Sequence, residues 1–317
     1  MQKRKLGRSG IRISPLAFGG NIFGWTVDEP QSFRLLDALV EYGLDFVDTA
    51  DVYSRWVPGN KGGESETIIG RWLQKSGKRK EIIIATKAGM DMGDGKKGLA
   101  KAYLLQSVEN SLKRLQTDYI DLFQSHQDDP ETPLEETLSA YDQLIRAGKV
   151  RAIGASNYSA ERLAEALAIS ERENLPRYET LQPHYNLYHR EDYEKNLEPL
   201  VLEKGLGVIT YFSLASGFLT GKYRSEADLS QSPRGQGIKK YLNERGFRIL
   251  AALDHVAQEH SSAPARVALA WLLTRPGITA PIASATNLNQ LQDLVEATKL
   301  QLSQSEIDQL TDASAGG

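Results

Sequence analysis

Short apolar runs alternate with helical patterns along almost the whole chain. In residues 100–115, for example, Leu104, Val108, Leu112 and Leu115 recur three or four positions apart and so share one face of a helix. The apolar runs are rich in β-branched residues, which is typical of strands buried on both faces of a parallel sheet. These runs lie at residues 16–20, 44–50, 81–87, 119–126, 150–157, 179–186, 206–213 and 278–284.

A stretch with helical spacing follows each of these runs. The stretches lie at residues 32–43, 65–73, 100–115, 134–148, 160–170, 193–205, 248–260 and 289–297. Eight strand-then-helix units predict a (β/α)8 TIM barrel, formed by a single domain over residues 1–317. Two short strands around residues 7–10 predict an N-terminal β-hairpin at the bottom of the barrel. The polar stretch 220–244 is the one large insertion.

The composition of the chain disfavours nucleic acids and membranes as its binding partners. A formal net charge of -3 and a pI near 6.0 give no electrostatic reason to expect nucleic acid or an anionic membrane. No apolar run is long enough to span a membrane, and the basic opening stretch lacks the apolar core of a secretory signal. The absence of cysteine excludes disulfides, thiolate metal sites and cysteine nucleophiles. We therefore expect a cytoplasmic protein that acts on a small molecule.

Polar residues end six of the predicted strands. The carboxyl ends of barrel strands converge on one mouth, so a polar residue at the last position of a strand points into the active-site region. The six residues are Asp48, Lys87, His126, Asn157, Gln182 and Tyr211. One polar strand end is ordinary in any protein. Six at corresponding places favour a functional site at this mouth.

Acid–base chemistry is indicated by four residues, because Tyr53 follows Asp48 within the stretch FVDTADVYS. A free tyrosine keeps its proton up to about pH 10, and an adjacent lysine ammonium lowers that pKa. Lys87 would supply this charge, with Asp48 as its counter-charge. His126 would donate a hydrogen bond to a carbonyl oxygen. Together they predict protonation of a carbonyl oxygen as it becomes an alkoxide.

Such a reaction needs a reductant, and the sequence lacks the GxGxxG pattern of a Rossmann dinucleotide site. The glycine-containing loop 211–223 offers amides and hydroxyls to a pyrophosphate, with Lys222 adding charge. Asn157 and Gln182 carry amides able to pair with a carboxamide, and Tyr211 offers a flat face for a ring. These groups suit a nicotinamide.

The chain resembles the aldo-keto reductase superfamily over residues 4–300. The segments that carry the resemblance occur in the family's order and are DFVDTADVYS, IIIATK, DLFQSH, GASN, LQPHYN and YFSLASGFLTGK. The resemblance implies a (β/α)8 barrel and NADPH-dependent reduction of aldehydes and ketones without a metal. Tyr53 then matches the general acid, Lys87 and Asp48 its tuning partners, and His126 the residue that orients the carbonyl.

The resemblance also implies a set of cofactor-binding residues. Ser156, Asn157 and Gln182 match the carboxamide binders, and Tyr211 matches the stacking platform. The residues that match the pyrophosphate loop are Ser213, Leu214, Ser216, Gly217 and Leu219.

The adenosine end of the cofactor falls on residues 281–294, where many relatives carry Lys or Arg for the 2'-phosphate. The corresponding residues are Ser284, Thr286, Asn287, Gln290 and Asp293, with Leu294 in place of an Asn. Neutral groups bind phosphate less strongly than arginine does. We therefore expect NADP(H) with NAD(H) as the alternative, and capping of a helix is the alternative role for Asn287.

Trp25 and Trp56 lie in loops after strands and are expected to wall the carbonyl pocket, with packing under a neighbouring loop as the alternative. Arg55 and Lys61 are interpreted as solvated surface residues. The substrate, its stereochemistry and the oligomeric state stay open.

Three rival functions were weighed. A metal-dependent hydrolase is disfavoured because no HxH or HExxH pair is present. A Schiff-base aldolase would need a deprotonated Lys87, which a neighbouring Asp48 opposes. The third alternative is a protein of the same fold that serves as a nucleotide-sensing binding subunit of a larger assembly and turns over slowly.

Overall fold

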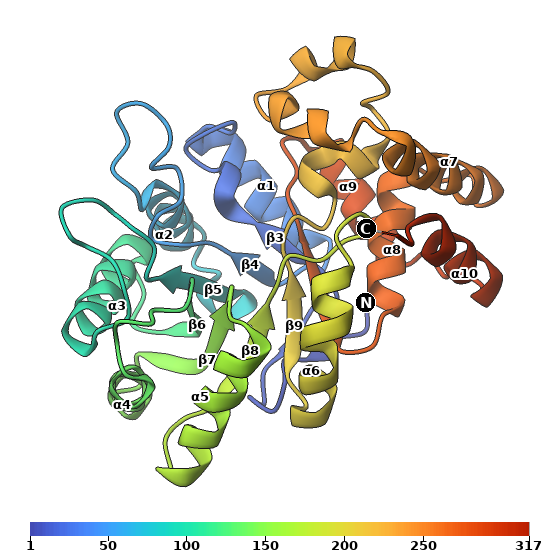
Figure 1. The fold of residues 1–317 in the computed structure, drawn as a ribbon. Coiled ribbons are helices and arrows are strands. Elements are labelled where there is room, and N and C mark those ends of the chain that lie inside the picture. The colour runs from blue at the N-terminus through green and yellow to red at the C-terminus, as the bar shows by residue number, and fades with distance from the viewer. Residues whose placement is uncertain (317) are drawn as a thin grey trace.

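A closed barrel of eight parallel strands forms the centre of the molecule, which confirms the predicted (β/α)8 architecture (Figure 1). The computed structural model describes residues 1–316. The barrel strands are β3 (Ala17–Gly19), β4 (Phe46–Asp48), β5 (Ile83–Ala88), β6 (Ile120–Ser125), β7 (Val150–Ser156), β8 (Tyr178–Gln182), β9 (Gly207–Thr210) and β10 (Ile278–Ala283). They neighbour one another in chain order, and β10 closes the barrel against β3.

Helices cover the outside of the barrel. Those that follow the predicted stretches are α1 (Glu29–Glu41), α2 (Glu64–Ser76), α3 (Lys101–Leu115), α4 (Leu134–Arg146), α5 (Ala160–Arg172), α6 (Glu198–Lys204), α7 (Glu244–Glu259) and α9 (Leu288–Ala297). The stretch predicted at 193–205 begins as a π-helical turn, Tyr193–Leu197, before it continues as α6. None of the helices within residues 1–316 is long and apolar enough to cross a membrane.

Two helices were not predicted, and their sequences explain why. In α8 (Pro264–Thr274) the run from Val267 to Leu272 is buried without a break, so no apolar stripe stands out from a polar face. The other, α10 (Gln304–Ala313), buries only Leu310 and begins with a capping box between Ser303 and Glu306. It lies on the outside of the barrel against α7 and α8 (Figure 1).

The predicted hairpin is also present and closes the bottom of the barrel. Its strands β1 (Arg4–Lys5) and β2 (Arg12–Ile13) pair antiparallel. Leu6, Ile11 and Ile13 are buried in one apolar cluster with inward-facing barrel residues. The glycine at the turn is required, because Gly7 has a φ of 57° and a Cβ there would collide with the carbonyl oxygen of Glu179.

The barrel interior divides into an apolar lower half and a polar upper half. The lower half belongs to the same cluster as the hairpin and contains Ala17, Phe46, Ala85, Leu122, Ala152, Ile209 and Ala280. In the upper half the strand register sets Lys87 beside Gln124 and Ser156 beside Gln182. Gly154 leaves room there, because a Cβ would collide with Thr180 Oγ1. The polar half opens at the mouth formed by the carboxyl ends of the strands.

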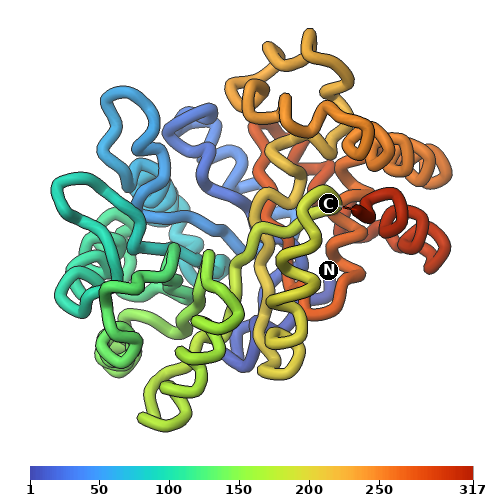
Figure 2. The backbone as a smooth tube through the Cα atoms, in the orientation of Figure 1, coloured from blue at the N-terminus to red at the C-terminus, as the bar shows by residue number. Residues whose placement is uncertain are grey.

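The insertion between β9 and α7 has a packed structure of its own. It contains two 3-10 segments, η5 (Glu226–Gln231) and η6 (Gly235–Tyr241). Its buried residues include Leu229, Ile238 and Tyr241. Residues 220–244 are therefore held by a few buried apolar side chains although most of the segment is polar. In Figure 2 the insertion is the orange loop system next to α7.

Candidate active site

A buried ion pair lies at the carboxyl ends of β4 and β5. Lys87 Nζ is 2.5 Å from Asp48 Oδ1 and donates to the Thr49 carbonyl oxygen at 2.9 Å. Asp48 is in register with Ala85, which is two residues before Lys87 and on the same face of β5. Burial lowers the pKa of Lys87, and the Asp48 carboxylate opposes this shift. Each charge thus makes the burial of the other tolerable.

Two glutamines complete the surroundings of Asp48. Gln182 Nε2 donates to Asp48 Oδ2 at 2.8 Å, and Gln124 Nε2 approaches the same oxygen at 3.4 Å. Gln124 was not predicted as a site residue. Its signal was present in the sequence, because Gln124 precedes His126 by two residues and therefore shares the inward face of β6. Gln182 lies at the mouth with its amide nitrogen directed to the Asp48 carboxylate.

Tyr53 lies in the loop directly after β4 and reaches back over the ion pair. Lys87 Nζ is 5.0 Å from the centroid of the Tyr53 ring. The loop is fixed by the next residue, because Ser54 has a φ of 70° and its Oγ donates to the Phe23 carbonyl oxygen at 2.7 Å. This anchor holds Tyr53 at the mouth.

The expectation that the pKa of Tyr53 is lowered is wrong. Burial and the nearby Asp48 carboxylate raise the pKa of Tyr53 well above its ordinary value, and Arg234 is the cation that opposes them. The Lys87 ammonium, which is paired with Asp48, does not offset this rise. The Tyr53 hydroxyl therefore keeps its proton at neutral pH, as a proton donor must.

His126 stands on the other side of Tyr53, with ring centroids 6.0 Å apart. Burial and, less strongly, Lys87 lower the pKa of His126 well below its ordinary value, so its imidazole is neutral. Its Nδ1 is buried and has no hydrogen-bond partner among residues 1–316. Asn157 Nδ2 donates to the His126 carbonyl oxygen at 2.9 Å, which fixes the backbone at this strand end. A neutral imidazole can donate one hydrogen bond into the mouth.

The residues expected to hold a carboxamide and a ring also lie together. Tyr211 donates through its hydroxyl to Asn157 Oδ1 at 2.7 Å, and Ser156 Oγ donates to the Gln182 carbonyl oxygen at 2.9 Å. Tyr211 stacks on His184, a residue not predicted, with centroids 5.3 Å apart and planes 15° apart. Three neighbouring strand ends thus deliver these groups to one side of the mouth.

The loop after β9 has an unusual backbone. Phe212, Ala215, Ser216 and Gly217 all have positive φ angles, of 50°, 48°, 59° and 103°. Successive residues that include left-handed conformations can turn their amides toward a common point and form a concave anion site. Of the other predicted loop residues, Ser213 is buried with its Oγ donating to Thr210 O, and Leu219 is buried. Leu214 is partly exposed, and Lys222 is exposed.

At the adenosine end the predicted residues form a local hydrogen-bond network at the start of α9. Asn287 accepts from the Gln290 backbone at 2.9 Å, which confirms that it caps the helix. Thr286 donates to Gln290 Oε1, and Ser284 donates to the Gly19 carbonyl oxygen. Asp293 pairs with Arg266 at 2.6 Å. Arg266 was not predicted, because it comes from α8, which was itself missed.

The two predicted tryptophans lie beside Tyr53. Trp25 and Trp56 meet edge to face with centroids 5.5 Å apart, and Trp56 is 6.0 Å from Tyr53. Trp56 is 48% exposed, so it is not simply packed beneath a neighbouring loop. Arg55 and Lys61 are exposed, as expected of solvated residues. The three aromatic rings therefore form one wall of the mouth.

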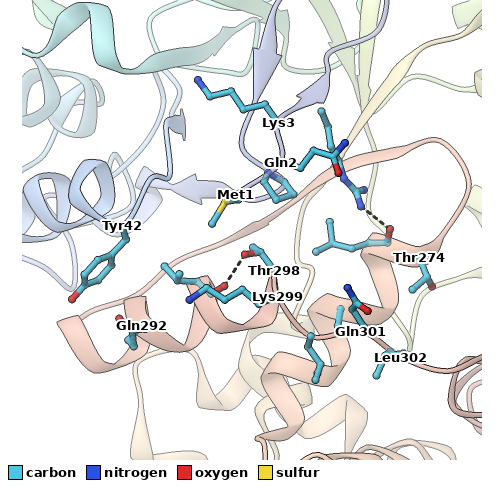
Figure 3. A pocket seen from close by; sticks show the side chains of 16 residues that line it. Met1, Gln2, Lys3, Tyr42, Thr274, Gln292, Thr298, Lys299, Gln301 and Leu302 are labelled. Carbon is cyan, nitrogen blue, oxygen red and sulfur yellow. Dashed lines mark hydrogen bonds between the residues drawn. The ribbon is translucent and has the colours of Figure 1, made fainter.

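A surface hollow of about 1060 Å³ lies at the opposite end of the barrel. Figure 3 shows Met1, Gln2 and Lys3 beside Thr298 and Lys299 in this hollow. Its arginine, Arg4, is already bound to the carbonyl oxygens of Ile278 and Leu273. Within residues 1–316 no group of three or more histidine, aspartate or glutamate side chains is arranged to hold a metal ion.

Comparison with known proteins agrees with this architecture. The model of the aldo/keto reductase family matches residues 15–315. The chain is 36% identical to an uncharacterized oxidoreductase, YrpG, from Bacillus subtilis, covering 100% of this chain and 97% of the relative. It is 33% identical to the L-glyceraldehyde 3-phosphate reductase of Escherichia coli, over 100% of this chain and 93% of the relative.

A probable voltage-gated potassium channel subunit beta from Arabidopsis thaliana is 33% identical over 94% of this chain and 91% of its own length. Relatives of this chain thus include proteins named as an oxidoreductase, a reductase and a probable channel subunit. The matched family model, which extends over nearly all of the barrel, shows that the chain belongs to the aldo/keto reductase family.

Proposed function

We propose that this protein reduces aldehydes or ketones to alcohols with a nicotinamide cofactor, NADP(H) in the first place and NAD(H) as the alternative. The observation that carries the proposal is the convergence of Tyr53, Lys87, Asp48 and His126 at one mouth. Members of the aldo/keto reductase family generally use NADP(H) or NAD(H). The E. coli relative is named as a reductase of a phosphorylated aldehyde.

Each of the four residues has a separate role in this proposal. His126 donates a hydrogen bond to the carbonyl oxygen and orients it, because its imidazole is neutral. Tyr53 transfers its hydroxyl proton to the same oxygen as the alkoxide forms, and the resulting phenolate regains a proton from solvent. Lys87 stabilises that phenolate while Asp48 holds the lysine in place.

The mouth has groups that fit a dinucleotide. When bound, the nicotinamide would supply the hydride that reduces the carbonyl carbon. Tyr211, Asn157 and Gln182 stand together where the ring and its carboxamide would be held. The left-handed backbone at Ala215, Ser216 and Gly217, with Lys222, Ser213, Leu214 and Leu219, suits the pyrophosphate.

The adenosine would lie on Ser284, Thr286, Asn287, Gln290 and Asp293. Arg266 adds a cation to this end, through its pair with Asp293. A cation here favours NADP(H), because a 2'-phosphate gains more from a guanidinium than a ribose hydroxyl does.

The second candidate is a nucleotide-binding subunit with slow turnover, and the identity to a probable potassium channel subunit beta favours it. The four residues proposed to carry the reaction, Asp48, Tyr53, Lys87 and His126, lie together at one mouth, which favours an enzyme that turns over. We therefore place the reductase first.

Titration of the purified protein with NADPH and with NADH, followed by fluorescence, tests cofactor binding. Absorbance of the reduced nicotinamide after addition of a panel of aldehydes then tests turnover. Tight binding with carbonyl-dependent oxidation supports the reductase and reveals the preferred nucleotide. Binding without oxidation across the panel supports the binding subunit, and the absence of binding by either nucleotide overturns both.

A further inference from the structure

Two histidines of the segment after β8 lead from Tyr211 toward the insertion. The centroid of the His184 ring is 5.3 Å from that of Tyr211, with the planes 15° apart, so His184 covers one face of the Tyr211 ring. The His189 ring lies 4.2 Å from the His184 ring, with the planes 41° apart. Neither histidine has a part in the reaction proposed above. The three rings nevertheless form one continuous contact that begins at the residue proposed to hold the nicotinamide.

The other end of this contact lies in the insertion. His189 Nε2 is 3.2 Å from the hydroxyl of Tyr241, a buried residue of η6. The Tyr241 ring stacks on Phe218 of the loop after β9, with centroids 5.3 Å apart and planes 24° apart. The two histidines therefore connect the insertion with Tyr211.

Asn186 fixes the segment that carries both histidines. It is fully buried, and its Oδ1 accepts from the backbone N–H groups of Tyr188 and His189 at 2.8 and 2.9 Å. Its Nδ2 donates to the Phe212 carbonyl oxygen at 2.8 Å and approaches His184 Nε2 at 3.4 Å. These hydrogen bonds join the segment after β8 to the loop after β9. The positions of both histidines are therefore set by hydrogen bonds as well as by ring packing.

Both imidazoles are neutral at neutral pH. Burial, the neighbouring His189 and, less strongly, Lys240 lower the pKa of His184 to about 4. Burial, Lys240 and Arg245 lower the pKa of His189 as well. The two rings therefore stack on each other without charge repulsion, and His184 presents a neutral flat ring to Tyr211.

We propose that His184 and His189 are positioning residues, which hold the Tyr211 ring in the orientation that the nicotinamide needs. The proposal rests on the proposed function, since it requires a nicotinamide on the face of Tyr211 that His184 leaves free. The Tyr211 hydroxyl is fixed by Asn157 at 2.7 Å, and the histidine stack fixes the face of the ring. A ring that is ordered before the ligand arrives loses less conformational freedom on binding, so this arrangement raises affinity.

Titration with NADPH and with NADH, followed by fluorescence, tests this role. For His184→Ala we expect the Kd of both nucleotides to rise by about 3-fold to 10-fold, the loss typical of one aromatic pair. His184→Phe keeps an aromatic ring and should bind within about 2-fold of the wild type. His189→Ala should raise the Kd less than His184→Ala does, because its ring contacts His184 and not the platform itself.

Nucleotide fragments separate a loss of nicotinamide binding from general damage to the mouth. ADP-ribose and its 2'-phosphate lack the nicotinamide, so in competition with NADPH they should bind His184→Ala as tightly as the wild type. Equal weakening of the fragments and the whole nucleotides would overturn the proposal. His255→Ala is the matched control, because His255 is an exposed histidine of α7, and this variant should leave every Kd unchanged.

The remaining outcomes distinguish this inference from the proposed function. Wild-type binding of NADPH that is unchanged in His184→Ala refutes only the role of the histidines. Tighter binding by His184→Ala also refutes it, because His184 would then occupy the face of Tyr211 that the nicotinamide uses. A wild-type protein that binds neither NADPH nor NADH refutes the proposed function and the role of the histidines together.

Discussion

The two halves of the barrel interior are built from the same strands but carry opposite chemistry. Below, Phe46, Leu122 and Ile209 pack with the hairpin into a dry apolar cluster. Above, Asp48, Lys87 and Gln182 are equally buried but polar, and each depends on a named partner. Apolar burial stabilises the fold without directional requirements. Burial of a polar group costs free energy that its partners must offset, so the upper half can hold reactive groups while the lower half stabilises the fold.

The largest expected effect comes from breaking the ion pair in the upper half. Lys87→Met leaves the Asp48 carboxylate buried without its cation, and we expect the free energy of unfolding to fall by about 3–5 kcal/mol. Reduction should be lost with it. Urea denaturation measures the stability. The double variant Asp48→Asn/Lys87→Met should regain most of the stability without activity; if it stays as unstable as the single variant, charge pairing is not the cause.

In the lower half of the barrel interior, a substitution is expected to reduce stability without reducing activity. Leu122→Ala removes a fully buried side chain and should cost about 2–5 kcal/mol of stability, with kcat within about 3-fold of the wild type because no polar group is disturbed. Leu202, which is 51% exposed, provides the control, since Leu202→Ala should change stability by less than about 0.5 kcal/mol. A large loss of kcat in Leu122→Ala would mean that the two halves are coupled.

A pH-dependent effect is expected of Asp51, a carboxyl group of the upper half that lacks a full set of partners. Its Oδ1 is buried and has no hydrogen-bond partner in the part of the chain that the structure describes. Burial and, less strongly, repulsion from Glu66 raise the pKa of Asp51 to about 8. The unfolded chain releases this proton at a lower pH than the folded protein does. The contribution of Asp51 to stability is therefore fully present at acidic pH and is lost as the pH rises toward 8.

Asp51→Asn removes that titration. We expect the variant to gain in Tm relative to the wild type as the pH is raised from about 5 to about 8, measured by thermal unfolding across the range. A Tm difference that does not change with pH would show that Asp51 is already ionised in the folded protein.

Local patterns were sufficient to predict the barrel, because each strand and most helices have their own periodicity. They failed for α8, whose residues are buried on nearly every side, and for α10, which has one buried leucine. The gathering of polar residues at one mouth was predicted because the carboxyl ends of barrel strands converge whatever the conformation of the loops. Gln124 was missed although its spacing from His126 indicates the same inward face.

Other features of the site depend on distances that sequence does not contain. The direction of the Tyr53 pKa is set by which charge lies nearer and which is already neutralised. Arg234 sits in a polar stretch with no periodicity, so only the folded insertion brings it to Trp25. Arg266 and Asp293 come from different helices and meet only after folding.

The central claim is that Tyr53 is the proton donor of the upper half. The most direct measurement is the single-turnover rate of NADPH oxidation with a saturating aldehyde, for the wild type and Tyr53→Phe, together with NADPH affinity by fluorescence. We predict a loss of about 10²-fold to 10⁴-fold in rate with affinity unchanged. A variant that oxidises NADPH at the wild-type rate would contradict the claim.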